Sequence, residues 1–126
     1  MVGESGELVA AWVKRYEIMH IQGKNVSEAQ ALLWASIEVD EICRENPQNA
    51  LKVIANILGS TENEYALAML AAGPLEILLA NHGKEVIADV ERLAKTEPRF
   101  RTLLKGVWQN LMDDQTWGRV LKAAKG

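Results

Sequence analysis

The apolar residues of this chain recur with the period of an α-helix, and this spacing limits the possible folds more than any other feature of the sequence. The clearest example follows Pro98, where apolar residues fall at i, i+3, i+4, i+7 and i+11, which places them on one side of a helix. These residues are Phe100, Leu103, Leu104, Val107 and Leu111. Similar stripes cover the rest of the chain, and no segment alternates apolar and polar residues as a half-buried strand does. The sequence therefore predicts an all-α fold.

Glycine, proline and N-cap residues divide this helical sequence into about eight short helices. Gly73-Pro74 is expected to form a tight turn between two helices, because glycine tolerates left-handed backbone angles and proline is accepted at a first helical position. Asn46 is the expected N-cap of the helix that starts at Pro47. Thr61 is that of the helix before Gly73-Pro74, and Asp113 or Asp114 that of the last helix. The expected ranges are 7–22, 27–44, 47–58, 61–72, 75–82, 86–93, 98–111 and 114–124. Gly106 weakens the helix over 98–111 and allows a break there.

The loops between the expected helices are short, which favours antiparallel neighbours. Pro47, Pro74 and Pro98 each start a helix, at intervals of 27 and 24 residues, as in stacked helix pairs of the HEAT-like kind. Apolar positions superimpose poorly when the segments are aligned on these prolines. A HEAT-like helical stack and a compact irregular bundle therefore both remain open.

Length and charge narrow the class of protein further. A chain of 126 residues is expected to form a single domain over 1–126. Its net charge of −3 lacks the positive field of a duplex-binding protein, which argues against a nucleic-acid partner. The N-terminus does not have the pattern of a signal peptide, and no apolar run reaches the roughly 20 residues of a membrane helix. We therefore expect a cytoplasmic protein without membrane contact.

The common catalytic and cofactor motifs are missing from the sequence. Two histidines and one cysteine are too few for the usual zinc sites, and no phosphate-binding glycine loop or serine nucleophile motif occurs. Cys43 extends the apolar side of its predicted helix, which indicates a buried small residue rather than a nucleophile. We expect no catalytic residues, no metal, no cofactor and no enzyme activity.

An aromatic residue and three acids share one side of the helix predicted over 27–44. Trp34, Glu38, Glu41 and Glu45 follow one another at i, i+4, i+7 and i+11. One interpretation is a solvated helix face with Trp34 at the edge of a wide apolar side. The other is an anchor for a partner, because tryptophan is enriched among residues that dominate interface energies.

Two arginines flank Phe100 near a predicted helix N-terminus. Arg99 and Arg101 could hold a phosphate or carboxylate there, or lie on a solvated basic face. Glu76, early in the helix after Gly73-Pro74, can accept bonds from unpaired N–H groups, and His82 lies in the last turn before Gly83. Each of these residues has a structural explanation beside a functional one.

Two motif blocks resemble a known family. The first runs from Leu70-Ala71-Ala72-Gly73-Pro74-Leu75-Glu76 through His82-Gly83, and the second from Pro98-Arg99-Phe100-Arg101 through Val107-Trp108-Gln109-Asn110. Together they resemble a family of small bacterial proteins of unknown function, over roughly residues 8–120. The resemblance implies a bacterial, all-helical, HEAT-like domain. It implies no activity and therefore no catalytic residues.

These observations lead to a protein-binding module as the first functional hypothesis, with a bacterial immunity or inhibitor protein acting on a toxin or effector as its narrower form. The second is a protein that binds a small molecule or nucleotide phosphate, and the third an enzyme with an unfamiliar site. We place the candidate binding site at Glu76, His82, Arg101 and Trp108. Trp108 follows Val107 at the margin of the apolar stripe after Pro98, where an aromatic side chain can be packed on one side and exposed on the other. The sequence indicates neither the partner nor the oligomeric state.

Overall fold

The computed structural model describes residues 2–126, with side chains from residue 6 onward, and this part of the chain consists of helices joined by loops, with no strand. The predicted all-α fold is therefore confirmed. The helices, in chain order, are α1 (Val2–Gln22), α2 (Ser27–Ala31), α3 (Leu33–Glu45), α4 (Pro47–Ser60), α5 (Glu64–Leu70), the π-helical segment η1 (Ala71–Leu75), α6 (Glu76–Thr96), α7 (Pro98–Leu104) and α8 (Asp114–Lys125).

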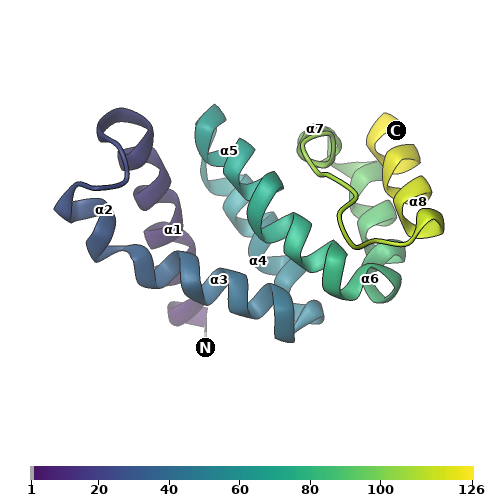
Figure 1. The fold of residues 1–126 in the computed structure, drawn as a ribbon, viewed down its shortest axis with the longest axis horizontal. Coiled ribbons are helices and arrows are strands. Elements are labelled where there is room, and N and C mark those ends of the chain that lie inside the picture. The colour runs from purple at the N-terminus through teal and green to yellow at the C-terminus, as the bar shows by residue number, and fades with distance from the viewer. Residues whose placement is uncertain (1) are drawn as a thin grey trace.

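The helices are stacked along the long axis of the molecule (Figure 1). Helices α1 and α2 lie at one end, α3 runs from that end into the middle, α4 and α5 lie in the middle, and α6 to α8 lie toward the other end. Helix α4 packs against α1, α3 and α6, and α6 packs against α3 and α8. One continuous core therefore runs through the stack, and its largest fully buried side chains include Trp12, Ile54, Leu78 and Phe100.

The chain does not turn at Gly73-Pro74, so that prediction is wrong. Helix α5 continues through η1 into α6 without an interruption of the helical hydrogen bonding, and Gly73 does not have a positive φ. Proline inside an α-helix loses one hydrogen bond and collides with the carbonyl four residues before it. The wider π register around the buried Pro74 accommodates the ring, so the helix continues.

A kink occurs instead at His82, where φ is −136° and ψ is 25°. The sequence predicted a helix end at Gly83, and the structure has a bend there within α6. Gly83 is buried, and a Cβ atom at this position would lie 2.9 Å from Thr116 Cγ2. The glycine therefore allows the start of α8 to approach α6 closely.

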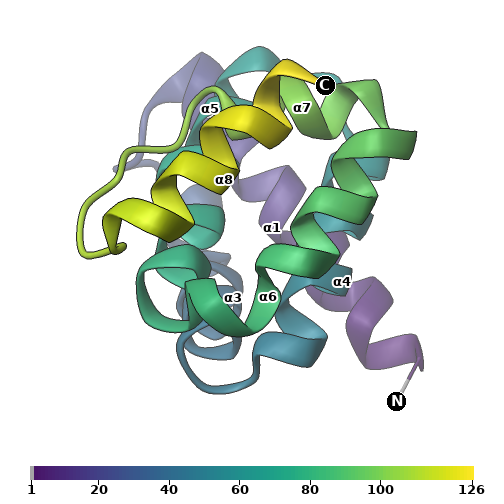
Figure 2. The same cartoon turned by 90° about the vertical axis from the view of Figure 1, so that its right-hand side faces the viewer.

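Helix α7 ends at Leu104, and residues 105–113 form a loop rather than the predicted continuation to residue 111. The break near Gly106 is confirmed. The loop leaves α7, crosses one side of the molecule and returns to the start of α8 (Figure 2). As a result α8 runs in the same direction as the second half of α6: Gly83 faces Thr116, and Glu91 pairs with Arg119.

The other helix boundaries follow local chemistry. Asn46 and Asp113 act as N-caps as predicted, and accept hydrogen bonds from the backbone N–H groups of Asn49 and Thr116. The N-cap of α5 is Asn63 and not Thr61, because the Asn63 side chain accepts from the backbone N–H of Ala66. The expected helix over 27–44 is divided at Leu32, whose φ of −101° and ψ of 5° are not helical.

The continuous helix Glu64–Thr96 is, by length and composition alone, long and apolar enough to span a membrane. Of its most apolar 18-residue window, 44% is buried inside the fold. Core helices of soluble proteins pass the same test, because they pack against neighbours on several sides. The expectation of no membrane contact stays a prediction.

Candidate functional site

The loop 105–113 is held in place by one carboxylate of α6. Glu76 Oε2 accepts a hydrogen bond from the backbone N–H of Trp108 at 3.3 Å, and Glu76 Oε1 accepts one from the side-chain amide of Asn110. Asn110 has a φ of 47°, a left-handed conformation that asparagine tolerates better than most residues. Glu76, one of the predicted site residues, thus positions a loop more than 30 residues further along the chain.

A second set of contacts closes the loop onto itself and onto α8. The Gln109 side-chain amide donates to the Met112 carbonyl at 3.1 Å and to Asp114 Oδ1 at 2.9 Å. Val107 and Met112 are both buried in the core. The loop is therefore fixed at both ends by apolar contacts and along its length by hydrogen bonds.

This fixed loop presents two large apolar side chains to solvent. Trp108 is 74% exposed and Leu111 is 87% exposed. Trp108 was predicted from its place at the margin of an apolar stripe. Leu111 was assigned to the stripe itself and is not buried, because the helix ends before it. The only feature of the sequence that could have predicted the exposure of Leu111 was Gly106, five residues earlier, which allows the helix to end before Leu111.

His82 connects the kink of α6 to the end of α3. Its Nε2 lies 2.5 Å from the Arg44 carbonyl oxygen, and its Nδ1 lies 2.9 Å from Glu85 Oε1. The hydrogen bond to Glu85 and the one to the Arg44 carbonyl raise the pKa of His82 above its usual 6.5, because both favour a ring that carries two N–H groups. His82 and Leu111 line the same surface pocket.

Arg101 lies apart from this region and holds α7 in place. Its guanidinium donates to the Ala94 carbonyl at 2.6 Å and lies against Gly126. Arg99 donates to the Thr61 carbonyl at 2.6 Å, and the Glu97 carboxylate accepts from the backbone N–H of Arg99. An acidic side chain thus occupies the end of α7 where a phosphate was considered.

Three of the four predicted site residues lie at or next to the 105–113 loop, but only Glu76 and Trp108 are in contact with each other. Glu76 contacts the backbone of Trp108, and His82 lies at the pocket that Leu111 also lines. Arg101 is not part of this group. Of the three, only Trp108 is largely free to contact another molecule, because Glu76 and His82 are engaged in bonds within the chain.

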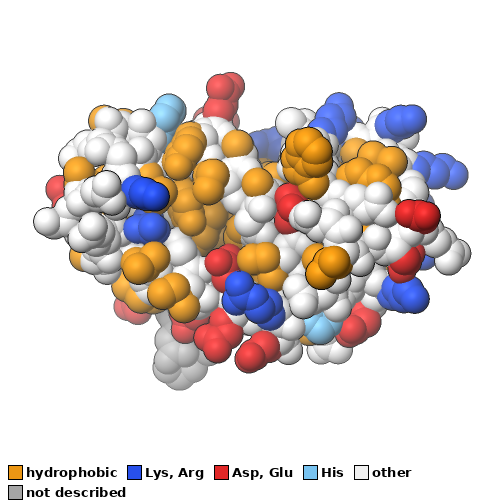
Figure 3. All heavy atoms as spheres, in the orientation of Figure 1, with side chains coloured by type: hydrophobic (Ala, Val, Ile, Leu, Met, Phe, Trp, Pro, Cys, Tyr) orange, Lys and Arg blue, Asp and Glu red, His pale blue; other side chains and the backbone are white. Residues whose placement is uncertain are grey.

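The side of α3 that the sequence singled out is exposed. Trp34 is 47% exposed and Ile37 is 57% exposed, and Leu33 is exposed beside them. Glu38, Glu41 and Glu45 are all exposed on the same side of the helix. Hydrophobic and acidic side chains lie next to one another over α3 in Figure 3.

The geometry favours neither a cysteine nucleophile nor a metal centre among the described side chains. Cys43 is fully buried, and burial together with the nearby Asp40 carboxylate raises the pKa of its thiol to about 12, so it stays protonated near neutral pH. Among the side chains from residue 6 onward, no three His, Cys, Asp or Glu residues are grouped as metal ligands.

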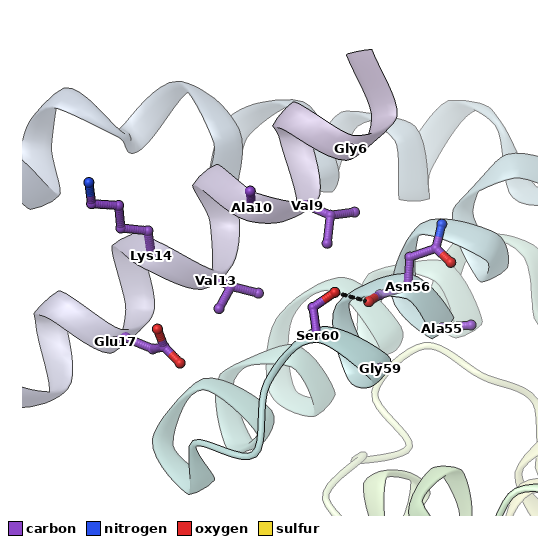
Figure 4. A pocket seen from close by; sticks show the side chains of 10 residues that line it. All are labelled: Gly6, Val9, Ala10, Val13, Lys14, Glu17, Ala55, Asn56, Gly59 and Ser60. Atoms are coloured by element: carbon purple, nitrogen blue, oxygen red, sulfur yellow. Dashed lines mark hydrogen bonds between the residues drawn. The ribbon is translucent and has the colours of Figure 1, made fainter. Parts of the chain in front are cut away.

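The described surface has several cavities large enough for a ligand, and two of them differ in character. A groove of about 860 Å³ runs between α1 and α4; Lys14 and Glu17 lie on one wall, Asn56 and Ser60 on the other, and Ser60 donates to the Asn56 carbonyl (Figure 4). A more apolar cleft of about 380 Å³ lies between α4, α5 and α7. Neither cavity contains a pair of groups arranged for nucleophilic or acid–base catalysis.

Comparison with known proteins gives one positive result. No curated protein and no solved structure matches the chain. A family model described as a family of unknown function, DUF6869, matches residues 22–126, which include α3, the 105–113 loop and α8. The chain is therefore a member of the DUF6869 family of unknown function.

Proposed function

We propose that this protein is a protein-binding module and that Trp108 and Leu111 anchor its partner. The observation that carries the proposal is a loop held by internal hydrogen bonds that exposes two large apolar side chains. A flexible loop displaying such residues would lose conformational entropy on binding, whereas a fixed loop has lost most of it on folding.

The chemistry of the two side chains fits this role. Tryptophan supplies a large contact area with few rotatable bonds, and it is enriched among the residues that dominate interface energies. Burial of Trp108 and Leu111 on a folded partner would remove apolar surface from water. Binding needs only a complementary surface, which the exposed side chains of the loop can supply.

Three narrower statements belong to the same proposal. We propose a HEAT-like stack of helices, a bacterial source, and the role of a cytoplasmic immunity or inhibitor protein that acts on a toxin or effector. Stacked helices present broad surfaces for partners, which supports the first of these. The alternative is binding of a small molecule or nucleotide phosphate. The surface cavities have room for such a ligand, but the Arg99 and Arg101 guanidiniums, which were considered for a phosphate, bond backbone carbonyls on different elements.

The proposal is tested by capture from a lysate of the source cells, with three baits. The baits are the natural chain, Trp108→Ser and the control Ile21→Ser, which removes an equally exposed apolar side chain from α1. We expect one protein to be retained by the natural chain and the control but not by Trp108→Ser. All three baits should melt at the same temperature, because neither side chain is packed. Equal retention by the three baits would refute the role of Trp108.

A further inference from the structure

We infer that the exposed face of α3 docks a basic, amphipathic segment of the partner protein. We call this surface the α3 face and define it by Leu33, Trp34, Ile37, Glu38, Glu41 and Glu45. The inference rests on the proposed function, since it adds the chemical nature of the partner. It concerns other residues than those of the 105–113 loop, so each can fail separately.

The first half of the α3 face exposes apolar side chains that the core does not require. Trp34 and Ile37 are each about half exposed, and Leu33 is 44% exposed. The opposite side of the same helix already supplies its core contacts through Ala35, Val39 and Cys43. Isolated exposed apolar residues are common, but three within five residues on one side of a helix form a patch of the kind found at interaction sites.

The second half of the α3 face is acidic, and its carboxylates form no recorded ion pair among the described side chains. Between the side chains that the structure describes, no ion pair or hydrogen bond involves Glu38, Glu41 or Glu45. Arg44 is the basic residue between them and forms no ion pair with them either. A cationic partner would complement these carboxylates, whereas a nucleic acid or an anionic membrane would be repelled.

The α3 face and the 105–113 loop are joined by the end of α3. The Arg44 carbonyl, beside Glu45, accepts the hydrogen bond from His82, and His82 lines the same pocket as Leu111. Hydrophobic side chains over α3 and over the loop are visible from one side of the molecule (Figure 3). A single partner could contact both, with apolar groups at the ends and basic groups between them.

The test uses a defined probe, a labelled amphipathic helical peptide of leucine and lysine. Helix α3 has 13 residues and is about 20 Å long, so a peptide of about 15 residues matches its length. Fluorescence anisotropy is measured on the natural chain, on Trp34→Ser, on the triple variant Glu38→Gln, Glu41→Gln and Glu45→Gln, and on the control Ile21→Ser. Circular dichroism checks that every variant is folded.

We expect the triple variant to bind the peptide about tenfold more weakly, since three partly screened charge pairs are lost. Trp34→Ser should weaken binding by a similar factor, and Ile21→Ser should have no effect. Raising the salt from about 0.05 M to about 0.3 M should weaken binding to the natural chain and have less effect on the triple variant.

Several results would overturn the inference. The inference fails if the natural chain does not bind the leucine–lysine peptide, or if it binds a matched leucine–glutamate peptide equally well. It also fails if the triple variant binds the leucine–lysine peptide as tightly as the natural chain does. Preferential binding of a single-stranded RNA or of anionic lipid vesicles would overturn it as well, as would a dimer of this chain that is lost in Trp34→Ser. If the α3 variants retain the captured partner while Trp108→Ser loses it, the proposed function stands and this inference fails.

Discussion

Substitution of Gly83 by alanine tests the closest contact between α6 and α8. The added Cβ would lie 2.9 Å from Thr116 Cγ2, whereas carbon atoms in good contact are about 3.5–4.0 Å apart. The Thr116 side chain cannot easily rotate away from the added Cβ. The Asp113 carboxylate accepts hydrogen bonds from the backbone N–H of Thr116 at 2.7 Å and from the Thr116 hydroxyl at 3.1 Å. The Thr116 side chain is therefore fixed in one rotamer. The start of α8 must therefore move.

The cost follows from two opposing effects. Overpacking of a core costs about 1–3 kcal/mol, and replacing glycine by alanine inside a helix recovers up to about 1 kcal/mol. We expect Gly83→Ala to lower the free energy of unfolding by about 1–2 kcal/mol. For a chain of 126 residues, each kcal/mol corresponds to about 3–5 °C in the melting temperature.

Urea denaturation provides the measurement, with Gly59→Ala as the control. Gly59 is an exposed position in α4, and a Cβ added there would have no atom within 4 Å, so this variant should be neutral or slightly more stable. Thr116→Ser removes the Cγ2 methyl but keeps the hydroxyl, and it should reduce the cost of Gly83→Ala in a double-mutant cycle. A Gly83→Ala variant as stable as the control would refute the close packing of α6 on α8.

Three further predictions concern α6, η1 and the loop. Glu76→Ala should lower the free energy of unfolding by about 1 kcal/mol and make the 105–113 loop sensitive to limited proteolysis, because the Glu76 carboxylate holds Trp108 and Asn110. An unchanged cleavage pattern would count against this role of Glu76. Because the folded-state pKa of His82 is raised, its contribution to stability is complete below about pH 6.5 and is lost as the pH rises through that pKa. The stability difference between the natural chain and His82→Asn should therefore be larger at about pH 5.5 than at about pH 8.5; a difference independent of pH would contradict the bond to Glu85. Gly73→Ala should be neutral or stabilise by up to about 1 kcal/mol, since Gly73 is helical and has open space around it, whereas a large loss would indicate the turn that the sequence predicted.

Local signals in the sequence predicted most of the helices. The starts at Pro47 and Pro98 and the caps at Asn46 and Asp113 depend on bonds within one turn of the chain, so they could be identified without the fold. The stripe after Pro98 predicted the buried Phe100 and its neighbours, because the period of the pattern matches the period of the helix.

Features decided by distant contacts were not predicted. Gly73-Pro74 reads as a turn, but the preceding and following helices pack against the same core and the π register keeps them continuous. The helix after Pro98 was extended to residue 111 because the apolar spacing continues to Leu111. The end at Leu104 leaves residues 105–113 as a loop whose bonds to Glu76 cross more than 30 residues.

The candidate site was predicted in part for the same reason. Trp108 was selected because an aromatic at the margin of a stripe can be packed on one side and exposed on the other, and its side chain is exposed. Its partnership with Glu76 could not be derived from spacing. Arg101 was grouped with these residues because it lies near a helix start, yet its guanidinium reaches back to the Ala94 carbonyl.

The most direct test of the proposed function is isothermal titration of the captured partner, once purified, against this chain and its variants. Trp108→Ser and Leu111→Ser should each weaken binding by about tenfold or more, the lower end of the effect of losing an anchor residue at an interface. Both variants should keep the melting temperature of the natural chain, and Ile21→Ser should keep its affinity. Unchanged affinity in both loop variants, or a loss of affinity only in parallel with a loss of stability, would contradict a partner anchored by this loop.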